Sequence, residues 1–258
     1  MKKTLFILFI AISSLGFSQE KITEGVVTSK QTMSTDNVEL QGQLAMIGDI
    51  MTTTYFKGNK TRSETNNFMT GSSIAIMDND NNQMLMTLNN QMTGKKYVLQ
   101  TMEPSEDDVD SVKVTKGDST KNVLGYECQE YNVEIEKEGV VVKMDVYTTD
   151  KVSAISQQST MMGADLKGFP LYLTMNMSQM GMDLTITQEV TEIKKESVSD
   201  DKFDMTPPAG YEKTDKLQGM QASKFMILKK TAFYCCFFLL YILNILLNKS
   251  RRYIFARF

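Results

Sequence analysis

Methionine is the residue type whose number and spacing first suggest chemistry in this sequence. The chain has 20 methionines but no histidine. Three Met-x-Met pairs occur, at Met84/Met86, Met175/Met177 and Met180/Met182. Side chains alternate along a β-strand, so both sulfurs of a pair would point to one side of it. Such thioethers can line a deformable apolar pocket, bind a soft ion such as Cu(I), or fill an ordinary core. Without histidine, and with the pairs scattered, copper is the least favoured interpretation, and we predict no metal site.

The run Asp78–Asn82 (DNDNN) superficially resembles a calcium-binding loop. It lacks the glycine at the sixth position and the closing glutamate at the twelfth position that an EF-hand loop requires. Asn and Asp are also the residues that favour tight turns. A polar hairpin turn is therefore the preferred interpretation.

The other reactive groups do not form a recognisable catalytic set. The absence of histidine removes Ser-His-Asp and Cys-His nucleophiles and imidazole-bound metals. Carboxylate pairs such as Glu127 with Glu130 or Glu134 with Glu136 would need a defined separation to act as a glycosidase, and they fall on predicted solvent-facing sides. Cys128 is not expected to be a reactive thiol, because no histidine can activate it and the neighbouring Glu127 and Glu130 would raise its pKa. A half-buried structural cysteine is the preferred interpretation. We predict a protein that is not an enzyme and needs no cofactor.

Charge is unevenly distributed along the chain. All 31 acidic residues lie in 19–223, together with 19 of the 28 basic residues, so this segment carries a net charge of −12. Nucleic-acid binding needs a basic footprint on the protein. The composition therefore argues against a nucleic-acid partner.

The two ends differ from this middle segment. Residues 1–18 have two lysines, an apolar stretch from Leu5 to Ile12 and small residues at Gly16 and Ser18, the pattern of a secretory signal peptide. We expect export to the periplasm or the medium, with 19–223 forming a single β-rich domain. That segment has one cysteine, Cys128, so an internal disulfide is excluded and stability must come from an ordinary core.

The tail 224–258 is basic and contains 17 uncharged residues at 231–247. This length is at the short limit for a membrane-spanning helix. Two interpretations stay open: an inner-membrane anchor that gives membrane association through 231–247, or a tail unrelated to the domain, such as read-through past the natural end of the gene.

Alternating apolar and polar residues predict β-strands through most of the middle segment. The clearest alternating runs are at 83–88, 140–147, 171–178 and 184–191. Short polar turns separate the predicted strands: Lys57–Asn59, Asp78–Asn82, Lys116–Asp118, Lys137–Gly139 and Ser178–Gly181. Loops this short connect antiparallel neighbours.

Helical periodicity is scarce. The segment Asn37–Ile47 predicts a helix with Leu40, Leu44 and Ile47 on one stripe and Asp36 or Asn37 as its cap. Ser153–Lys167 is a second helix candidate or a loop. The predicted fold is mainly β: a curved antiparallel sheet of eight to ten strands, an unclosed half-barrel, with one or two short helices covering its concave face.

Several segments resemble the exported bacterial proteins grouped as domain of unknown function 4412. They are MSTDN…LAMIGDIMTTTYFKGNKTR (33–62), VTKGDSTKNVLGYECQEY (114–131), KGFPLYLTMNM (167–177) and EVTEIKKESVSDDKFDMTPPAGYEK (189–213). That family is in turn similar to the LolA-like lipoprotein carriers, partly through the ending Phe203-x-x-x-Pro207-Pro208-x-Gly210. This second resemblance implies an unclosed antiparallel barrel, a helical lid and a hydrophobic cavity for acyl chains. The family has no defined functional residues that could be carried over.

These observations favour a non-enzymatic, exported binding module. Its ligand would be hydrophobic or amphiphilic, a lipid or a lipidated protein, held on the concave face of the sheet. The predicted lining residues are Met84, Met86, Leu171, Leu173, Met175 and Met177. The alternative is a structural or protein-interaction domain of the envelope with a filled core and no ligand. A carboxylate hydrolase ranks third.

Overall fold

The computed structural model describes residues 20–67, 71–91, 93–102, 112–137, 140–156, 166–179 and 182–214. The predicted signal peptide (1–18) and the tail (224–258) lie outside these ranges, as does most of the helix candidate Ser153–Lys167. Within the described ranges, no helix is long and apolar enough to cross a membrane.

Most of the described chain forms β-strands. In chain order these are β1 (Glu24–Ser34), β2 (Ile50–Lys57), β3 (Lys60–Asn67), β4 (Gly71–Asp78), β5 (Gln83–Asn90), β6 (Gly94–Thr101), β7 (Val112–Val123), β8 (Tyr126–Lys137), β9 (Val140–Thr149), β10 (Phe169–Gln179), β11 (Met182–Lys194) and β12 (Glu212–Lys213). One α-helix, α2 (Val38–Ile47), and one 3-10 helix, η1 (Asp200–Phe203), complete the elements of the described residues. The predicted mainly β fold is confirmed, although eight to ten strands was too low a number.

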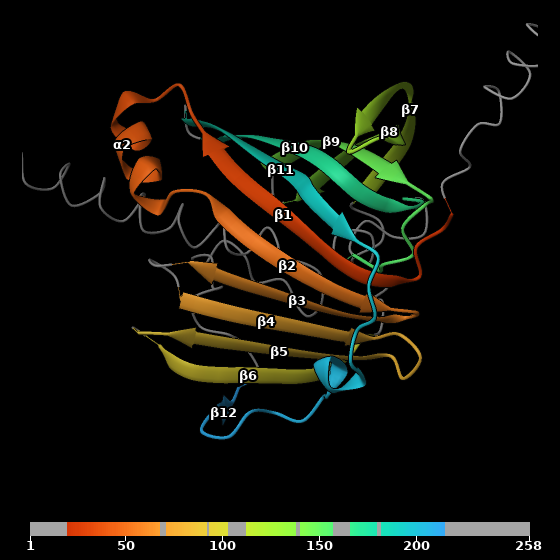
Figure 1. Ribbon diagram of the computed structural model, residues 1–258. Helices are drawn as coiled ribbons and strands as arrows, with labels where there is room; N and C mark the ends of the chain where they lie inside the picture. The colour runs from red at the N-terminus through yellow and green to blue at the C-terminus, as the bar shows by residue number, and fades with distance from the viewer. Residues whose placement is uncertain are drawn as a thin grey trace, which may run out of the picture.

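All strands belong to one curved sheet that is not closed into a barrel (Figure 1). Its order is β12-β6-β5-β4-β3-β2-β1-β11-β10-β9-β8-β7. Neighbours pair antiparallel, except that β12 pairs parallel with β6. The pairing of β1 with β11 joins two meanders, β1–β6 and β7–β11. We call this junction the seam.

Helix α2 begins where the sequence predicts. The Asn37 side-chain Oδ1 accepts a hydrogen bond from the Leu40 backbone N–H at 3.2 Å, which satisfies one of the free donors of the first turn. Leu40 and Leu44 are buried. The predicted apolar stripe therefore packs against the sheet, with Leu44 in its largest apolar cluster.

One predicted turn is wrong. Lys116–Asp118 does not separate two strands, because β7 runs through it with a bulge between Lys116 and Thr120. The partner strand holds the bulge: the Glu130 carboxylate accepts a hydrogen bond from the Ser119 N–H at 3.2 Å, and the Gln129 amide donates to the Gly117 carbonyl at 2.8 Å. A Gly-containing polar tripeptide looks the same in sequence whether it reverses the chain or bulges out of a strand.

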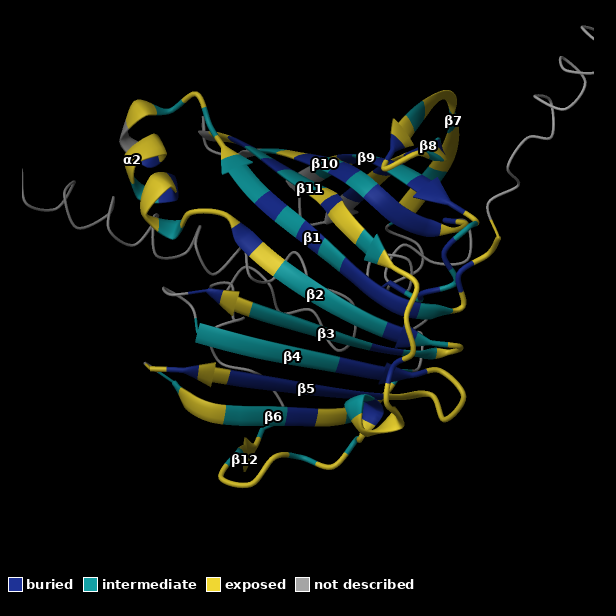
Figure 2. Cartoon of the chain, viewed as in Figure 1, coloured by how far each residue is buried: buried dark blue, intermediate teal, exposed yellow. Residues whose placement is uncertain are grey.

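Strand alternation divides the sheet into two faces. Both faces are buried along most of β5, which is mainly dark blue in Figure 2. Residues directly opposite each other on antiparallel strands share a face, so the register assigns each side chain. We call the face that carries Val27, Phe56, Met86 and Met175 the inner face. The opposite face is the outer face.

The segment after β11 crosses the outer face (Figure 1). Phe203 of η1 and Val198 are buried against Val26, with Tyr55 partly buried beside them. The Glu24 carboxylate accepts a hydrogen bond from the Val198 N–H at 2.7 Å. The chain then reaches the β6 edge, where β12 pairs with it.

The run Asp78–Asn82 forms the hairpin turn between β4 and β5, as predicted. Asp78 is 3% exposed and organises the turn. Its carboxylate accepts hydrogen bonds from the Asn81 backbone N–H (3.2 Å) and side chain (2.8 Å), and it pairs with Lys60 at 3.1 Å. Burial acts to raise the pKa of Asp78, but the Asn81 hydrogen bonds and Lys60 outweigh it and lower the pKa.

We expect Asp78→Ala to lower the free energy of unfolding at pH 7 by about 1–3 kcal/mol, because it leaves buried donors without their acceptor. A lowered folded-state pKa stabilises the fold above the unfolded-state value of about 3.9, and this contribution is lost as pH falls through the folded-state pKa. The difference between wild type and variant should therefore shrink below about pH 4. Urea unfolding at pH 7 and pH 3 measures this effect. Asp80→Ala, an exposed position in the same turn, is the control and should cost less.

Candidate ligand-binding face

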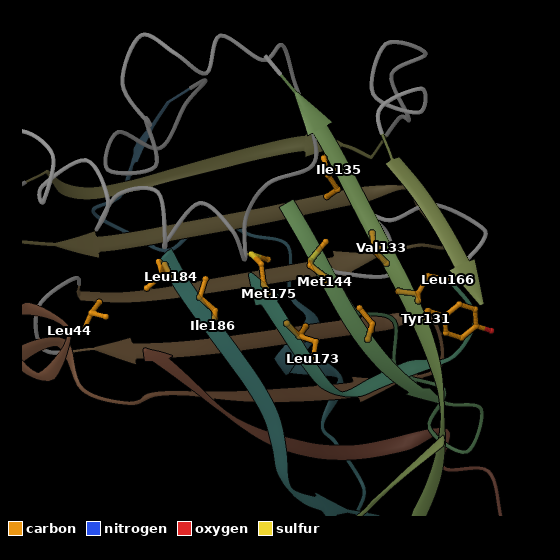
Figure 3. Close-up of a cluster of buried hydrophobic side chains, with 11 residues drawn as sticks. Leu44, Tyr131, Val133, Ile135, Met144, Leu166, Leu173, Met175, Leu184 and Ile186 are labelled. Carbon is orange, nitrogen blue, oxygen red and sulfur yellow. The ribbon is translucent and has the colours of Figure 1, made fainter. Parts of the chain in front are cut away.

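The inner face of β8–β11 carries the first of two apolar clusters, which we call wing A. Its buried residues are Tyr131, Val133, Ile135, Met144, Val146, Leu173, Met175, Leu184 and Ile186, with Leu44 of α2 and Leu166. Figure 3 shows these side chains gathered together. One row crosses four strands: Val133 lies opposite Met144, which lies opposite Met175, and Met175 lies opposite Ile186.

The second cluster, wing B, lies on β4–β6. Its buried residues are Met77, Met84, Met86, Leu88 and Val98. Met77 lies directly opposite Met84, and Met86 lies opposite Val98. Three of the five side chains are thioethers, which are flexible and polarizable.

Between the wings, the inner face carries uncharged polar side chains as well as buried apolar ones such as Val27 and Phe56. Hydroxyl side chains occupy inner-face positions of β1–β4; we call them the hydroxyl band, and they are Ser29, Thr52, Thr54, Ser63, Thr65 and Ser73. Thr52 and Thr65 hydrogen-bond through their hydroxyl oxygens at 2.9 Å, and Thr54 and Ser63 do so at 3.0 Å. All but Ser29 are only partly buried.

Two buried amides border the wings. Gln31 lies opposite Ile50 on one side and Gln188 on the other, and Gln188 lies opposite Leu173 of wing A. Gln100 lies opposite Met84 of wing B. The Nε2 atoms of Gln31 and Gln100 are buried and have no hydrogen-bond partner among the described residues. A buried donor left in this state costs about 1–3 kcal/mol.

Charge is confined to the outer face across most of the sheet. The register places every charged side chain of β1–β5 and β9–β11 there: Glu24, Lys30, Lys57, Lys60, Arg62, Glu64, Asp78, Lys143, Asp145, Asp183, Glu189, Glu192 and Lys194. The inner face of these strands is thus free of charged side chains. It is apolar at its wings and carries neutral polar groups together with the buried apolar Val27, Ile50 and Phe56 between them. Such a surface suits a ligand with apolar and neutral polar parts.

The structure divides the predicted lining residues among three clusters. Met84 and Met86 belong to wing B. Leu173 and Met175 belong to wing A, and Met177 packs partly buried against it. Leu171 is in a further cluster with Cys128, Phe169 and Phe56.

The predicted strand faces are therefore present, but they do not form one continuous methionine surface. The pair Met180/Met182 falls where side chains are not described.

The hydroxyl band and the two glutamines were not predicted as site residues. The sequence pattern that marks the hydroxyl band is the alternation of hydroxyl residues in Thr52-x-Thr54 and Ser63-x-Thr65. However, alternating hydroxyls occur on both sides of β-strands, so only the register shows that they meet. No group of three His, Cys, Asp or Glu side chains suited to a metal occurs in the described parts of the chain.

Cys128 is fully buried, at 0% exposed, and not half-buried as predicted. Burial, with a smaller contribution from the Glu127 charge, raises the pKa of the thiol to about 11. The predicted direction is confirmed, but burial is its main cause.

We expect iodoacetamide at pH 8 to modify native Cys128 at least about 100-fold more slowly than in urea, because the reactive thiolate is scarce and reached only by opening. Mass spectrometry of the peptide that contains Cys128 measures this rate. Equal rates in buffer and urea would contradict the buried placement.

Comparisons with known proteins show limited likeness to solved structures. Two structures of PNGF-II match 74% and 75% of this chain at 15% identity, with TM-scores of 0.41 and 0.42. The match spans only 31% and 32% of those chains. The Mycobacterium tuberculosis lipoprotein LppX matches 68% of this chain and 89% of its own at 8% identity, with a TM-score of 0.30. Likeness at this level carries no argument about function.

The search of curated proteins gave no match. The family model described as domain of unknown function DUF4412 matches residues 38–211. This match covers well over half of the sequence and includes α2, β2–β11 and η1. The chain therefore belongs to the DUF4412 family.

Proposed function

We propose that this protein is a non-enzymatic binding module that holds a hydrophobic or amphiphilic ligand, of the lipid or lipidated-protein class, on the concave inner face of its sheet. The observation that carries the proposal is the charge-free inner face of β1–β5 and β9–β11. It contrasts with a segment whose net charge is −12. Charged side chains cost a great deal to bury without a partner, and their exclusion is what a lipid-binding face requires.

Affinity would come from burial of apolar surface. Each Å² removed from water contributes about 25 cal/mol before the entropy cost of association. The methionines of wing B, Met77, Met84 and Met86, adapt their shape because thioether chains are unbranched and flexible. The proposed ligand contacts are Met84 and Met86, with Leu173, Met175 and Met177 on the opposite wing.

The carboxylates offer little support for a hydrolase. Glu127 and Glu134 are exposed, and Glu130 holds the β7 bulge. The absence of histidine removes imidazole acid–base catalysis as well. The proposal is therefore a protein that binds its ligand and leaves it chemically unchanged.

The proposed setting is the periplasm or the medium, reached through the signal-like residues 1–18. The uncharged stretch 231–247 would add membrane association if it serves as an anchor. Both points rest on the sequence pattern. Cell fractionation of the full-length chain and of a variant that ends after residue 223 tests them together.

Native mass spectrometry of the protein purified from its own host's envelope tests the binding function, with an organic extract analysed for released lipid. We expect a stoichiometric bound mass that the extract identifies as a lipid or lipidated species. A bare mass that persists after incubation with fatty acids and phospholipids would overturn the proposal. It would favour the envelope interaction domain with a filled core.

A further inference from the structure

We propose that the hydroxyl band and Gln31 form a head-group subsite that selects amphiphiles with an uncharged, hydroxyl-bearing head group. The inference rests on the proposed function and names its ligand class. Its elements are the position of the band between the wings, a buried amide donor without a partner, and the absence of charge on this face.

The register aligns the band with the apolar wings. One row runs from Thr54 through Ser63 and Ala75 to Met86 of wing B. Neighbouring strands lie about 4.8 Å apart, so Met86 is about 10 Å from Ser63 across the sheet. A head group on the band would therefore place the first carbons of an acyl chain over wing B.

The paired hydroxyls suit a neutral polar partner. A hydroxyl both donates and accepts, so the Thr52–Thr65 and Thr54–Ser63 pairs still have hydrogen-bonding capacity for a ligand hydroxyl. These four side chains are partly buried. Hydrogen bonds made there are less weakened by water than those on an open surface.

Gln31 adds a donor that lacks a partner. Its side chain is 9% exposed, and its Nε2 has no partner among the described residues. It stands on the inner face beside Ser29 of the band, two residues away on β1, and next to wing A through Gln188. A ligand hydroxyl or ester oxygen would satisfy this amide and remove the cost of leaving it unpaired.

The same face disfavours an anionic head group. The register places no cation on the inner face of β1–β5, and Lys96 on β6 already pairs with Glu212. A phosphate or carboxylate placed on the band would lose water without gaining a counter-charge. The subsite should therefore discriminate by charge when the acyl chain is the same.

Two matched probes test this discrimination on the full-length chain. They are 1-oleoylglycerol and 1-oleoylglycerol-3-phosphate, which share the tail and the glycerol and differ by the phosphate. The affinity of each probe is measured by its displacement of the uncharged apolar dye N-phenyl-1-naphthylamine. Direct binding of the dye measures binding to the apolar wings. We expect 1-oleoylglycerol to bind at least tenfold more tightly than its phosphate.

The variant Thr54→Val/Ser63→Ala removes one hydroxyl pair together, a change that leaves no partner unsatisfied and so preserves the fold. It should weaken 1-oleoylglycerol about tenfold, equivalent to about 1.4 kcal/mol, and leave dye binding within about twofold. Gln31→Leu should act in the same direction. The matched control Thr53→Val changes the outer-face neighbour on the same strand and should change neither ligand.

The outcomes separate the inference from the function on which it rests. If the dye and both oleoyl probes fail to bind wild type, the proposed binding function itself is overturned. If the dye binds but the phosphate probe competes equally well, or the double variant retains full affinity for 1-oleoylglycerol, the head-group subsite is wrong and the apolar binding face stands. Circular dichroism of each variant confirms that the fold is intact.

Discussion

Replacing Gly25 with alanine is expected to lower the free energy of unfolding by about 3 kcal/mol or more. Gly25 lies on β1 at the seam, and a Cβ there would overlap the backbone carbonyl oxygen of Lys194 on β11. Backbone atoms paired in a sheet cannot move aside as the end of a flexible side chain can. The substitution should therefore separate the strands that join the two meanders.

Urea unfolding of the full-length chain, followed by far-ultraviolet circular dichroism, measures this loss. Gly42→Ala is the matched control, because a Cβ at that position in α2 meets nothing within 4 Å. It should stabilise the protein by about 0.5–1 kcal/mol through helix propensity. A Gly25→Ala protein as stable as wild type would show that the β1–β11 pairing at this end is not as described.

The β1–β11 pairing at the seam also shows which features of the fold could be predicted from local sequence patterns and which could not. Alternation along 171–178 correctly assigned the two faces of β10, and the turn at Asp78–Asn82 correctly joined β4 to β5, because both signals are local. The pairing of β1 with β11 joins residues more than 150 positions apart, such as Val27 and Ile193. No turn chemistry specifies that contact, so the sequence predicted one curved sheet but could not show that β1 and β11 are the strands that join its two meanders.

The lack of long-range information in the sequence also limited the prediction of the candidate site. Period-two patterning correctly placed Met84 with Met86, and Leu173 with Met175, on common strand faces. It could not show that the two pairs lie on separate wings with hydroxyls between them. That arrangement depends on the order of the strands across the sheet. The absence of charge from the inner face likewise became apparent only when the register assigned each charged side chain to one face of the sheet.

The separation of charge between faces also makes sense of the acidic composition. Some outer-face carboxylates meet cations, as Asp78 meets Lys60 at 3.1 Å, and others accept backbone hydrogen bonds, as Glu24 does from Val198 at 2.7 Å. The segment can therefore be strongly acidic while its inner face stays neutral. Under the proposed function, the charged outer face would give solubility and the uncharged inner face would bind the ligand.

Replacing Met144 with alanine is expected to lower the free energy of unfolding by about 2–5 kcal/mol, the range for large-to-small changes in packed cores. Met144 is 2% exposed and lies in wing A between Val133 and Met175. Truncation removes its transfer free energy and leaves a cavity that the neighbouring strands fill only in part. Lys143→Ala, the exposed outer-face neighbour on β9, is the control and should stay within about 0.5 kcal/mol of wild type.

This comparison also tests what kind of surface wing A is. The Met144→Ala protein could lose unfolding free energy near the upper end of the expected range, and the loss could be the same with and without ligand. This result would mean that wing A is packed core and that the ligand lies over wing B and the hydroxyl band. A loss that is small in the lipid-free protein but large when lipid is bound would mean that Met144 contacts ligand, because a ligand stabilises only the state that binds it. Equal stability of Met144→Ala and Lys143→Ala under both conditions would contradict the packing of wing A. Urea unfolding of the same preparations before and after organic extraction and refolding supplies the comparison.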